Sequence, residues 1–180
     1  MSKNLKNDLF TVLTDPVKSH KFLKNGLAID SEPLAILLVG AHSAKDLHKI
    51  SANKTTFDIV VTFMSTLNSK IIITLHVLTE TLNLIKNKIG PHCVKTIVNE
   101  ASILAEHTQK DLLNTRLVME PSIFCGVGET SCLLACKDTN GVFLVFDHKA
   151  AGYSTKSGVP TIELEDLKSW YYTSMSYSQA

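Results

Sequence analysis

The first part of the chain carries hydrophobic residues at helical spacing. In residues 71–89 they recur every three or four positions, which predicts a helix with one apolar side. The same kind of pattern predicts further helices over residues 3–13, 15–26, 55–67 and 92–113. The run PLAILLVG (33–40) is apolar throughout, and its periodicity fits a buried strand and a core helix equally well.

The pattern changes after residue 113. ETSCLLACK and GVFLVFDH flank DTNG, and an Asn-Gly pair between apolar runs predicts a β-hairpin over residues 129–148. TRLVMEPSIFCGVG (115–128) has β-type composition with a proline inside it, which predicts a bent or edge strand. A further strand is expected near 159–164, and EDLKSWYY predicts a closing helix with acidic residues at its start.

Together these elements predict an α+β fold. A mainly helical part (1–113) is expected to pack on a small antiparallel sheet in a β-rich part (114–175), which ends in the closing helix. Residues 1–175 are expected to form a single domain, and the small polar residues 176–180 a frayed tail.

Composition supports a folded core, since 44% of the 180 residues are hydrophobic and 19% are charged. The net charge of +1 argues against a broad nucleic-acid surface, although Lys18, Lys21 and Lys24 form a local basic face. No apolar window is long enough for a membrane span, and the N-terminus lacks the apolar core of a secretory leader. An intracellular location is therefore expected, in the cytoplasm or, for a viral protein, in the host cytoplasm or the virion.

The last fifty or so residues resemble the C-terminal half of viral large-tegument and related OTU-like, papain-like cysteine peptidase domains. The matching features are FDH (146–148), a loop containing Gly152 and Gly158, the strand PTIEL and the helix EDLKSWYY. The resemblance implies a peptidase-like scaffold with an Asp-His corner. That family places one residue between the Asp and the His, whereas Asp147 and His148 are adjacent, and adjacent side chains on a strand face opposite sides.

The candidate catalytic residues are Cys93, His148 and Asp147. Cys93 lies at the expected start of a helix, where the helix dipole favours a thiolate, and His148 is its candidate base. Asp147 or Asn140 is the candidate group that orients the imidazole.

Metal and cofactor sites are not expected. The combination of Cys125, Cys132, Cys136 and His148 lacks paired zinc knuckles, so core packing is the preferred interpretation of the cysteines. The glycines of CGVGET predict a turn or bulge rather than a phosphate loop, because no Lys-Ser/Thr pair follows them.

The leading functional hypothesis is a non-enzymatic interaction or structural protein, viral in character, on a degenerate peptidase-like scaffold. Its partner would be another protein, of host or virus, or a second copy of the chain, bound through Trp170, Tyr171 and Tyr172. The alternatives are an active papain-like cysteine peptidase or deubiquitinase, using Cys93 and His148, and a small nucleic-acid-binding accessory protein, using the N-terminal lysines.

Overall fold

The central feature of the fold is a parallel β-sheet. The computed structural model describes residues 23–67, 69–97, 109–110 and 126–177. Within them, five short strands lie in the order β3-β2-β1-β4-β5, and every neighbouring pair is parallel. The strands are β1 (Leu27–Ile29), β2 (Ile71–Thr74), β3 (Gln109–Lys110), β4 (Val142–Leu144) and β5 (Thr161–Ile162).

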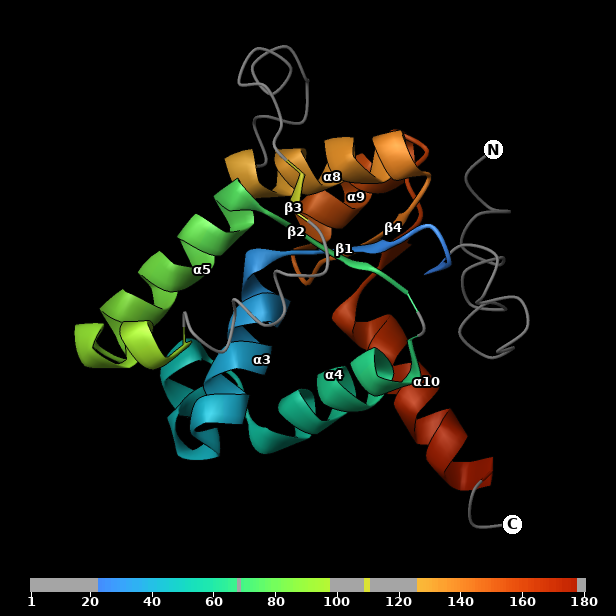
Figure 1. The fold of residues 1–180 in the computed structure, drawn as a ribbon. Helices are drawn as coiled ribbons and strands as arrows, with labels where there is room; N and C mark the ends of the chain where they lie inside the picture. The colour runs from blue at the N-terminus through green and yellow to red at the C-terminus, as the bar shows by residue number, and fades with distance from the viewer. Residues whose placement is uncertain (1–22, 68, 98–108, 111–125, 178–180) are drawn as a thin grey trace.

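Helices cover both faces of this sheet. Figure 1 shows α8 and α9 on one face and α3, α4 and α10 on the other. The bounds are α3 (Ser31–His42), the 3-10 helix η1 (Ala44–Ile50), α4 (Lys54–Thr66), α5 (Leu75–Lys88), α8 (Val127–Thr139), α9 (His148–Lys156) and α10 (Leu164–Tyr177). Residues 91–97 are also helical. This arrangement is a doubly wound α/β fold, in which the strand order reverses between β1 and β4.

The predicted antiparallel sheet is therefore wrong. The expected first hairpin strand is the helix α8, and the only β element of the hairpin is β4. Asn140 has φ 53°, so it ends α8 in the left-handed region rather than turning a hairpin. Residues 130–136 of α8 are all buried, and a helix that is buried all round shows no helical stripe in its sequence.

Several other expectations are settled by the described residues. The helix expected over 55–67 is present as α4, and the closing helix is present as α10. The run 33–40 lies within α3. The expected helix 71–89 begins as β2 and becomes helical only at α5, where the side chain of Thr74 accepts a hydrogen bond from the Val77 N–H. The strand near 159–164 exists as β5, but it pairs in parallel with β4.

Some expectations fall on residues outside this description. They are the helix 3–13, most of the helix 15–26 and most of the strand 115–128. The helix expected over 92–113 is helical to residue 97, and the strand β3 lies at residues 109–110.

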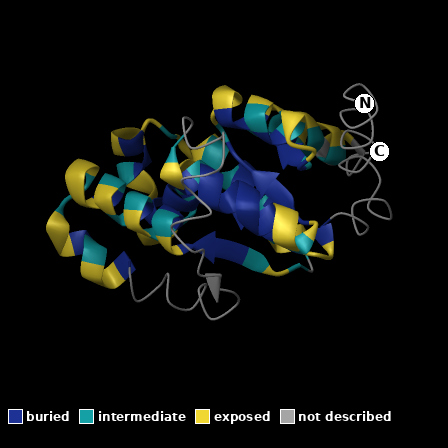
Figure 2. Cartoon of the chain, turned by 90° about the horizontal axis from the view of Figure 1, so that it is seen from above, coloured by how far each residue is buried: buried dark blue, intermediate teal, exposed yellow. Residues whose placement is uncertain are grey.

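The core lies between the sheet and its two helical layers. Every residue of β1 and β4 is at most 1% exposed, as is normal for a parallel sheet covered on both faces. Figure 2 shows this buried centre, with exposed residues on the outer sides of the helices. α10 packs on α4 through the rings of Trp170 and Phe63, which meet edge to face with centroids 5.6 Å apart. Among the helices of the described residues, none has the length and apolar character needed to cross a membrane.

The parallel arrangement gives the sheet two different edges. The carboxyl ends of all strands point to one edge, and α3, α5, α9 and α10 each begin close after a strand there. α8 also begins at this edge, because its C-terminus leads into the amino end of β4. Ligands of open α/β sheets bind outside the carboxyl ends of the strands, at the point where the strand order reverses. The residues around β1 and β4 at this edge are therefore the first candidates for a site.

A candidate carboxylate site at the carboxyl edge of the sheet

Four carboxylates gather at this edge from four separate segments. Asp30 follows β1, Asp147 lies between β4 and α9, Glu80 is in α5 and Glu129 is in the first turn of α8. Their charges interact: burial raises the pKa of Glu129, and Glu80 and Asp147 raise it further, while Glu129 and Glu80 add to the rise that burial causes in the pKa of Asp30. We call these four residues the carboxylate cluster.

Asp30 is the buried member of the cluster. It is 3% exposed, and its Oδ1 accepts a hydrogen bond from the Ser31 N–H at 2.7 Å, which caps α3. Burial raises the pKa of Asp30 to about 7 against the lowering effect of the Ser31 bond, and repulsion from Glu129, Glu80 and Glu32 adds to the rise. A serine or asparagine would cap the helix without burying a charge. The cap alone does not explain a carboxylate at this position.

Two glycines make room for the glutamates. The Gly128 N–H donates a hydrogen bond to Glu80 Oε1 at 3.2 Å, which joins α8 to α5. A Cβ atom on Gly128 would overlap the Glu80 carboxylate, and one on Gly126 would overlap the Glu129 carboxylate. Gly126 also has φ +139°, a conformation that favours glycine. The Gly-x-Gly of CGVGET, expected to form a turn or bulge, thus begins a helix and lets two carboxylates lie against its backbone.

Asp147 lies on the exposed side of the cluster. Its Oδ1 accepts a hydrogen bond from the Ala150 N–H at 2.8 Å, which caps α9. Burial raises the pKa of Glu32, at the start of α3, and the charge of Asp147 raises it further. Asp147 and Glu32 therefore extend the negative surface outward from the buried Asp30.

The imidazole of His148 pairs with Glu163 rather than with Asp147. His148 Nδ1 is hydrogen-bonded to Glu163 Oε2, which joins the start of α9 to the end of β5. The His148 side chain is 80% exposed and that of Glu163 is 22% exposed. Asp147 and His148 thus lie at the carboxyl edge of the sheet, and the carboxylate that the imidazole contacts is that of Glu163.

Cys93 lies in a different environment from His148. It belongs to the hydrophobic core and is 9% exposed, in the helical segment 91–97 that follows α5. The structure shows no hydrogen bond between Cys93 and His148 among the described residues. The role of Cys93 and His148 as a catalytic pair therefore remains a prediction.

The predicted partner-binding aromatics divide into two kinds. Trp170 and Tyr171 are partly buried and pack against the core, whereas Tyr172 is 56% exposed. The Tyr171 and Tyr172 rings meet edge to face with centroids 5.6 Å apart. Trp170 thus contributes to the packing of α10 on α4, and Tyr172 is the member available to a partner.

The donor atoms of the cluster suit a hard divalent cation. Carboxylate oxygens are preferred by Mg²⁺ and Mn²⁺, and the space left by Gly126 and Gly128 holds two of these groups against the α8 backbone. As they stand, no three Asp, Glu, His or Cys side chains of the described residues are close enough together to hold one metal ion. The cysteines do not supply such a site either: Cys132 Sγ donates to the Ile29 carbonyl at 3.4 Å, and burial raises the pKa of Cys136 to about 12.

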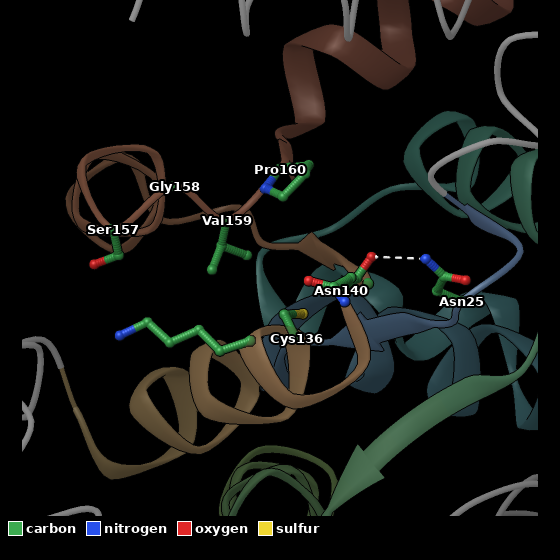
Figure 3. Close-up of a pocket in the computed structure, with 9 residues that line it drawn as sticks. Asn25, Cys136, Asn140, Ser157, Gly158, Val159 and Pro160 are labelled. Carbon is green, nitrogen blue, oxygen red and sulfur yellow. Dashed lines mark hydrogen bonds between the residues drawn. The ribbon is translucent and has the colours of Figure 1, made fainter. Parts of the chain in front are cut away.

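A cavity of about 440 Å³ opens at the opposite, amino edge of the sheet (Figure 3). Residues that precede strands line much of it, with the end of α9 and part of α8 completing the wall. The lining residues are Asn25, Cys136, Lys137, Asn140, Gly141, Ser157, Gly158, Val159 and Pro160. Asn25 Nδ2 donates to the Asn140 carbonyl at 3.2 Å, which ties the two turns together. No carboxylate lines this cavity, so it differs in chemistry from the carboxyl edge.

Comparison of the chain with protein-family models, with curated proteins and with solved structures finds no match. The proposals on function therefore rest on the geometry of the molecule.

Asp147 and His148 were predicted from the sequence as residues of a peptidase site, which remains a prediction, and Asp30, Glu80 and Glu129 were not predicted as site residues. A signal for Asp30 was present, because LAID and FLVFD both place an aspartate after a short apolar run. Two such runs are typical of adjacent parallel strands whose carboxyl ends meet at one edge. Residues 27–29 were too few to be recognised as a strand.

Proposed function

We propose that the protein is a divalent-cation-dependent hydrolase of phosphodiester bonds in nucleic acid. The observation that carries this proposal is the carboxylate cluster: Asp30, Glu80, Glu129 and Asp147 lie at the edge where the strand order reverses, with Asp30 buried and its pKa raised by the charges of Glu129 and Glu80 in addition to its burial. Four carboxylates in one place are costly unless something positive joins them. A doubly charged ion of the Mg²⁺ or Mn²⁺ class meets that requirement.

Binding of an ion would require the side chains of Glu80 and Glu129 to move. Glu80 is held by the Gly128 N–H, and Glu129 by its own N–H. Each of these bonds contributes roughly 1 kcal/mol, so attraction to a divalent cation is sufficient to exchange them. Asp30 and Asp147 are fixed by their helix caps. The two aspartates would provide a fixed frame, and the carboxylates of Glu80 and Glu129 would complete the set of ligands.

A bound ion of this class activates a water molecule and neutralises charge on a phosphate. The protein's own contribution is to hold its carboxylates at the edge where five helices begin. Helix N-termini carry partial positive charge and favour phosphate groups nearby. Anionic substrate can approach a negative cluster here because the ion and the helix ends offset the repulsion.

The surroundings of the cluster favour nucleic acid as the source of the phosphodiester. Leu75 and Val127 begin α5 and α8 at this edge, and they are 51% and 41% exposed. Exposed apolar side chains beside a phosphate-binding edge suit a single strand, which presents bases as well as phosphates. The low net charge of +1 argued against a broad basic surface, but contacts made through a cation do not need one.

The direct test is cleavage of fluorescent single-stranded RNA and DNA oligonucleotides with and without Mg²⁺ or Mn²⁺. We expect cleavage that EDTA abolishes, and a loss of about a hundredfold or more in Asp30→Asn and Asp147→Asn. Asparagine keeps both helix caps, so these variants are expected to remain folded. Asp58→Asn provides the matched control, because Asp58 lies on α4 in an exposed pair with Lys54. Absence of cation-dependent cleavage by the wild type, or full activity in Asp30→Asn, would overturn the proposal.

A second candidate function is protein binding through the C-terminal helix, and the exposed Tyr172 ring favours it. Tyr172→Ala is expected to weaken association with a partner or with a second copy while leaving the fold intact, because this ring is outside the core. Light scattering of the wild type and the variant measures self-association. A monomeric wild type at all concentrations would contradict the second-copy form of this hypothesis.

The peptidase alternative, with Cys93 and His148, also remains a prediction. Labelling of the wild type and of Cys93→Ala with a thiol-reactive peptide probe tests it.

A further inference from the structure

We infer that a basic surface at the C-terminal end of α5 binds phosphates of a single-stranded substrate at a distance from the one that is cleaved. This inference rests on the proposed function and adds a surface outside the carboxylate cluster. The surface is formed by η1, the last turn of α5 and the helical segment 91–97. η1 packs against α5, and 91–97 follows α5 directly, so the three segments lie together at the lower left of Figure 1. The lysines of this basic surface are Lys45, Lys49, Lys86, Lys88 and Lys95.

Positive charge is concentrated on the basic surface. All its lysines are exposed, and Asp46 is the single carboxylate residue within 44–50 and 84–97. With histidines neutral, these two stretches carry a net charge of +4, so the remainder of the chain carries −3 to give the total of +1. The low net charge of the chain therefore results from cancellation between separate regions, and it leaves room for a local contact with a polyanion.

Most of these lysines have no carboxylate beside them. Lys49 Nζ lies 2.6 Å from Asp46 Oδ1, whereas the other four ammonium groups have no ion-pair partner among the described residues. The helix dipole favours Lys86 and Lys88 in the last turn of α5. Lys45 lies in the first turn of η1, where the dipole disfavours a cation. Helix ends therefore do not account for the whole basic surface.

An exposed side of α5 connects the basic surface with the carboxyl edge of the sheet. Its residues recur every three or four positions and form one face of the helix: Leu75, Thr79, Asn83 and Lys86. α5 begins at the carboxyl edge, and at 1.5 Å per residue Lys86 lies about 16 Å along the helix axis from Leu75. None of the four is acidic, so a strand that leaves the carboxylate cluster past Leu75 reaches the lysines without crossing a negative charge on this face.

These features favour single-stranded nucleic acid over an acidic segment of protein. The exposed Leu75 side chain offers an apolar surface to a base, and the lysines offer positive charge to phosphates further along. A single strand carries both kinds of group along a flexible chain. An acidic peptide would use the lysines alone.

Fluorescence anisotropy with single-stranded DNA of about 12 nucleotides tests the inference, in EDTA so that no divalent cation contributes. The variant Lys86→Gln/Lys88→Gln/Lys95→Gln is expected to raise Kd about tenfold at about 0.1 M salt and to reduce the slope of log Kd against log salt by about 2. All three side chains are exposed, so the fold should be retained, which circular dichroism checks. Arginine at the same three positions should keep Kd near the wild-type value, because the charge is preserved.

The matched control removes three exposed lysines that lie outside the basic surface. It is Lys24→Gln/Lys70→Gln/Lys156→Gln, which changes the net charge by the same amount. We expect its Kd to stay within about twofold of the wild type, since a local contact depends on the position of the charge. An equal loss in the control, or no binding by the wild type in EDTA, would overturn the basic surface. Displacement of the labelled DNA by polyglutamate as readily as by unlabelled DNA would overturn the choice of nucleic acid.

Cleavage in Mn²⁺ separates this inference from the proposed function. The triple glutamine variant of the basic surface should raise KM for the 12-nucleotide strand about tenfold and leave kcat/KM for a dinucleotide unchanged, because a dinucleotide is too short to reach the lysines. If the wild type binds DNA through the basic surface but cleaves nothing, the hydrolase fails and the surface is supported. If the wild type cleaves and the triple variant keeps both Kd and KM, the hydrolase stands and the surface is overturned.

Discussion

The two edges of the sheet differ in the helix ends that they present and in the side chains that gather there. At the carboxyl edge, strands lead into helix N-termini and carboxylates gather, with Asp30 buried among them. At the amino edge, helix C-termini lead into strands, and the cavity is lined by turn residues such as Asn140 and Gly158. Among the described residues, the carboxylates that raise one another's pKa values lie at the carboxyl edge.

This difference separates residues that the fold requires from residues that it does not require. Left-handed residues at the amino edge are required for the chain to turn from α8 into β4 and from α9 toward β5. Burial of Asp30 at the carboxyl edge is not required by any turn, since an uncharged cap would serve. A buried carboxylate that lowers the stability of the fold and has no structural role indicates a functional role.

Asp30→Asn tests how much the burial of the Asp30 carboxylate lowers the free energy of unfolding. The pKa of about 7 in the folded protein exceeds the ordinary value of 3.8, so the folded state binds more protons than the unfolded state between these values. The free energy of unfolding of the wild type therefore falls as pH rises through this window. At about pH 8 without divalent cations, we expect Asp30→Asn to be more stable than the wild type by up to about 4 kcal/mol. Near pH 4 the two should be similar.

Urea unfolding at several pH values measures this difference. Asp58→Asn is the control, and we expect it to keep the pH dependence of the wild type, because its carboxylate lies on α4 away from the cluster. Added Mn²⁺ should reduce the difference in the free energy of unfolding between Asp30→Asn and the wild type at high pH, because the ion stabilises the wild type. If Asp30→Asn is less stable than the wild type at about pH 8, the interpretation of Asp30 as a functional cost is wrong.

Gly128→Ala tests the space that holds Glu80. The new methyl group would displace the Glu80 carboxylate, whose flexible side chain can move at little cost to the fold. We therefore expect about tenfold weaker Mn²⁺ binding, measured by calorimetric titration, with folding retained, since alanine favours the helix α8. Gly152→Ala is the matched control: its Cβ meets nothing within 4 Å, so it should stabilise α9 by about 0.5–1 kcal/mol and leave Mn²⁺ binding unchanged. Equal Mn²⁺ affinity in both variants would contradict the role of Glu80.

Asn140→Ala gives the smallest effect and tests the amino edge. Alanine in the left-handed conformation of Asn140 costs about 1 kcal/mol, so the free energy of unfolding should fall by that amount. Asn140→Gly should avoid the loss, because glycine adopts this conformation freely. Neither variant is expected to change Mn²⁺ affinity or cleavage. Reduced Mn²⁺ affinity in Asn140→Ala would show that the two edges are coupled, against the separation argued above.

The parts of the fold that could be predicted are those with a one-sided pattern. α4 has one buried and one exposed side, and the spacing of its apolar residues predicted it. α10 was predicted from the acidic residues at its start. β1 and β2 were not recognised as strands, because they are three and four residues long and their residues are almost all buried, which removes any alternation. Asn140-Gly141 supplied a left-handed residue that suits a hairpin and a helix end alike, and this ambiguity produced the wrong sheet.

Residues of the candidate site could be predicted only where the sequence contains a recognisable strand. Asp147 and His148 stood out because the five-residue run GVFLV and Phe146 precede them. Glu80 and Glu129 lie on helices, where a glutamate ordinarily indicates a solvated side, and their approach to one another depends on how α5 packs on α8. Only the three-dimensional arrangement shows that charges 49 positions apart in the sequence interact.

The pairing of β1 with β4 has a consequence for how the chain folds during synthesis. These central strands come from distant parts of the chain, and the bond from Asn25 to Asn140 beside them spans 115 positions. On a ribosome, β1 emerges early and can pair with β2, but one side of it stays open until β4 has been made. Long-range closure of this kind is slow and leaves an apolar strand edge exposed meanwhile. We therefore expect folding to depend on translation speed and on chaperones more than in a helical protein of the same length.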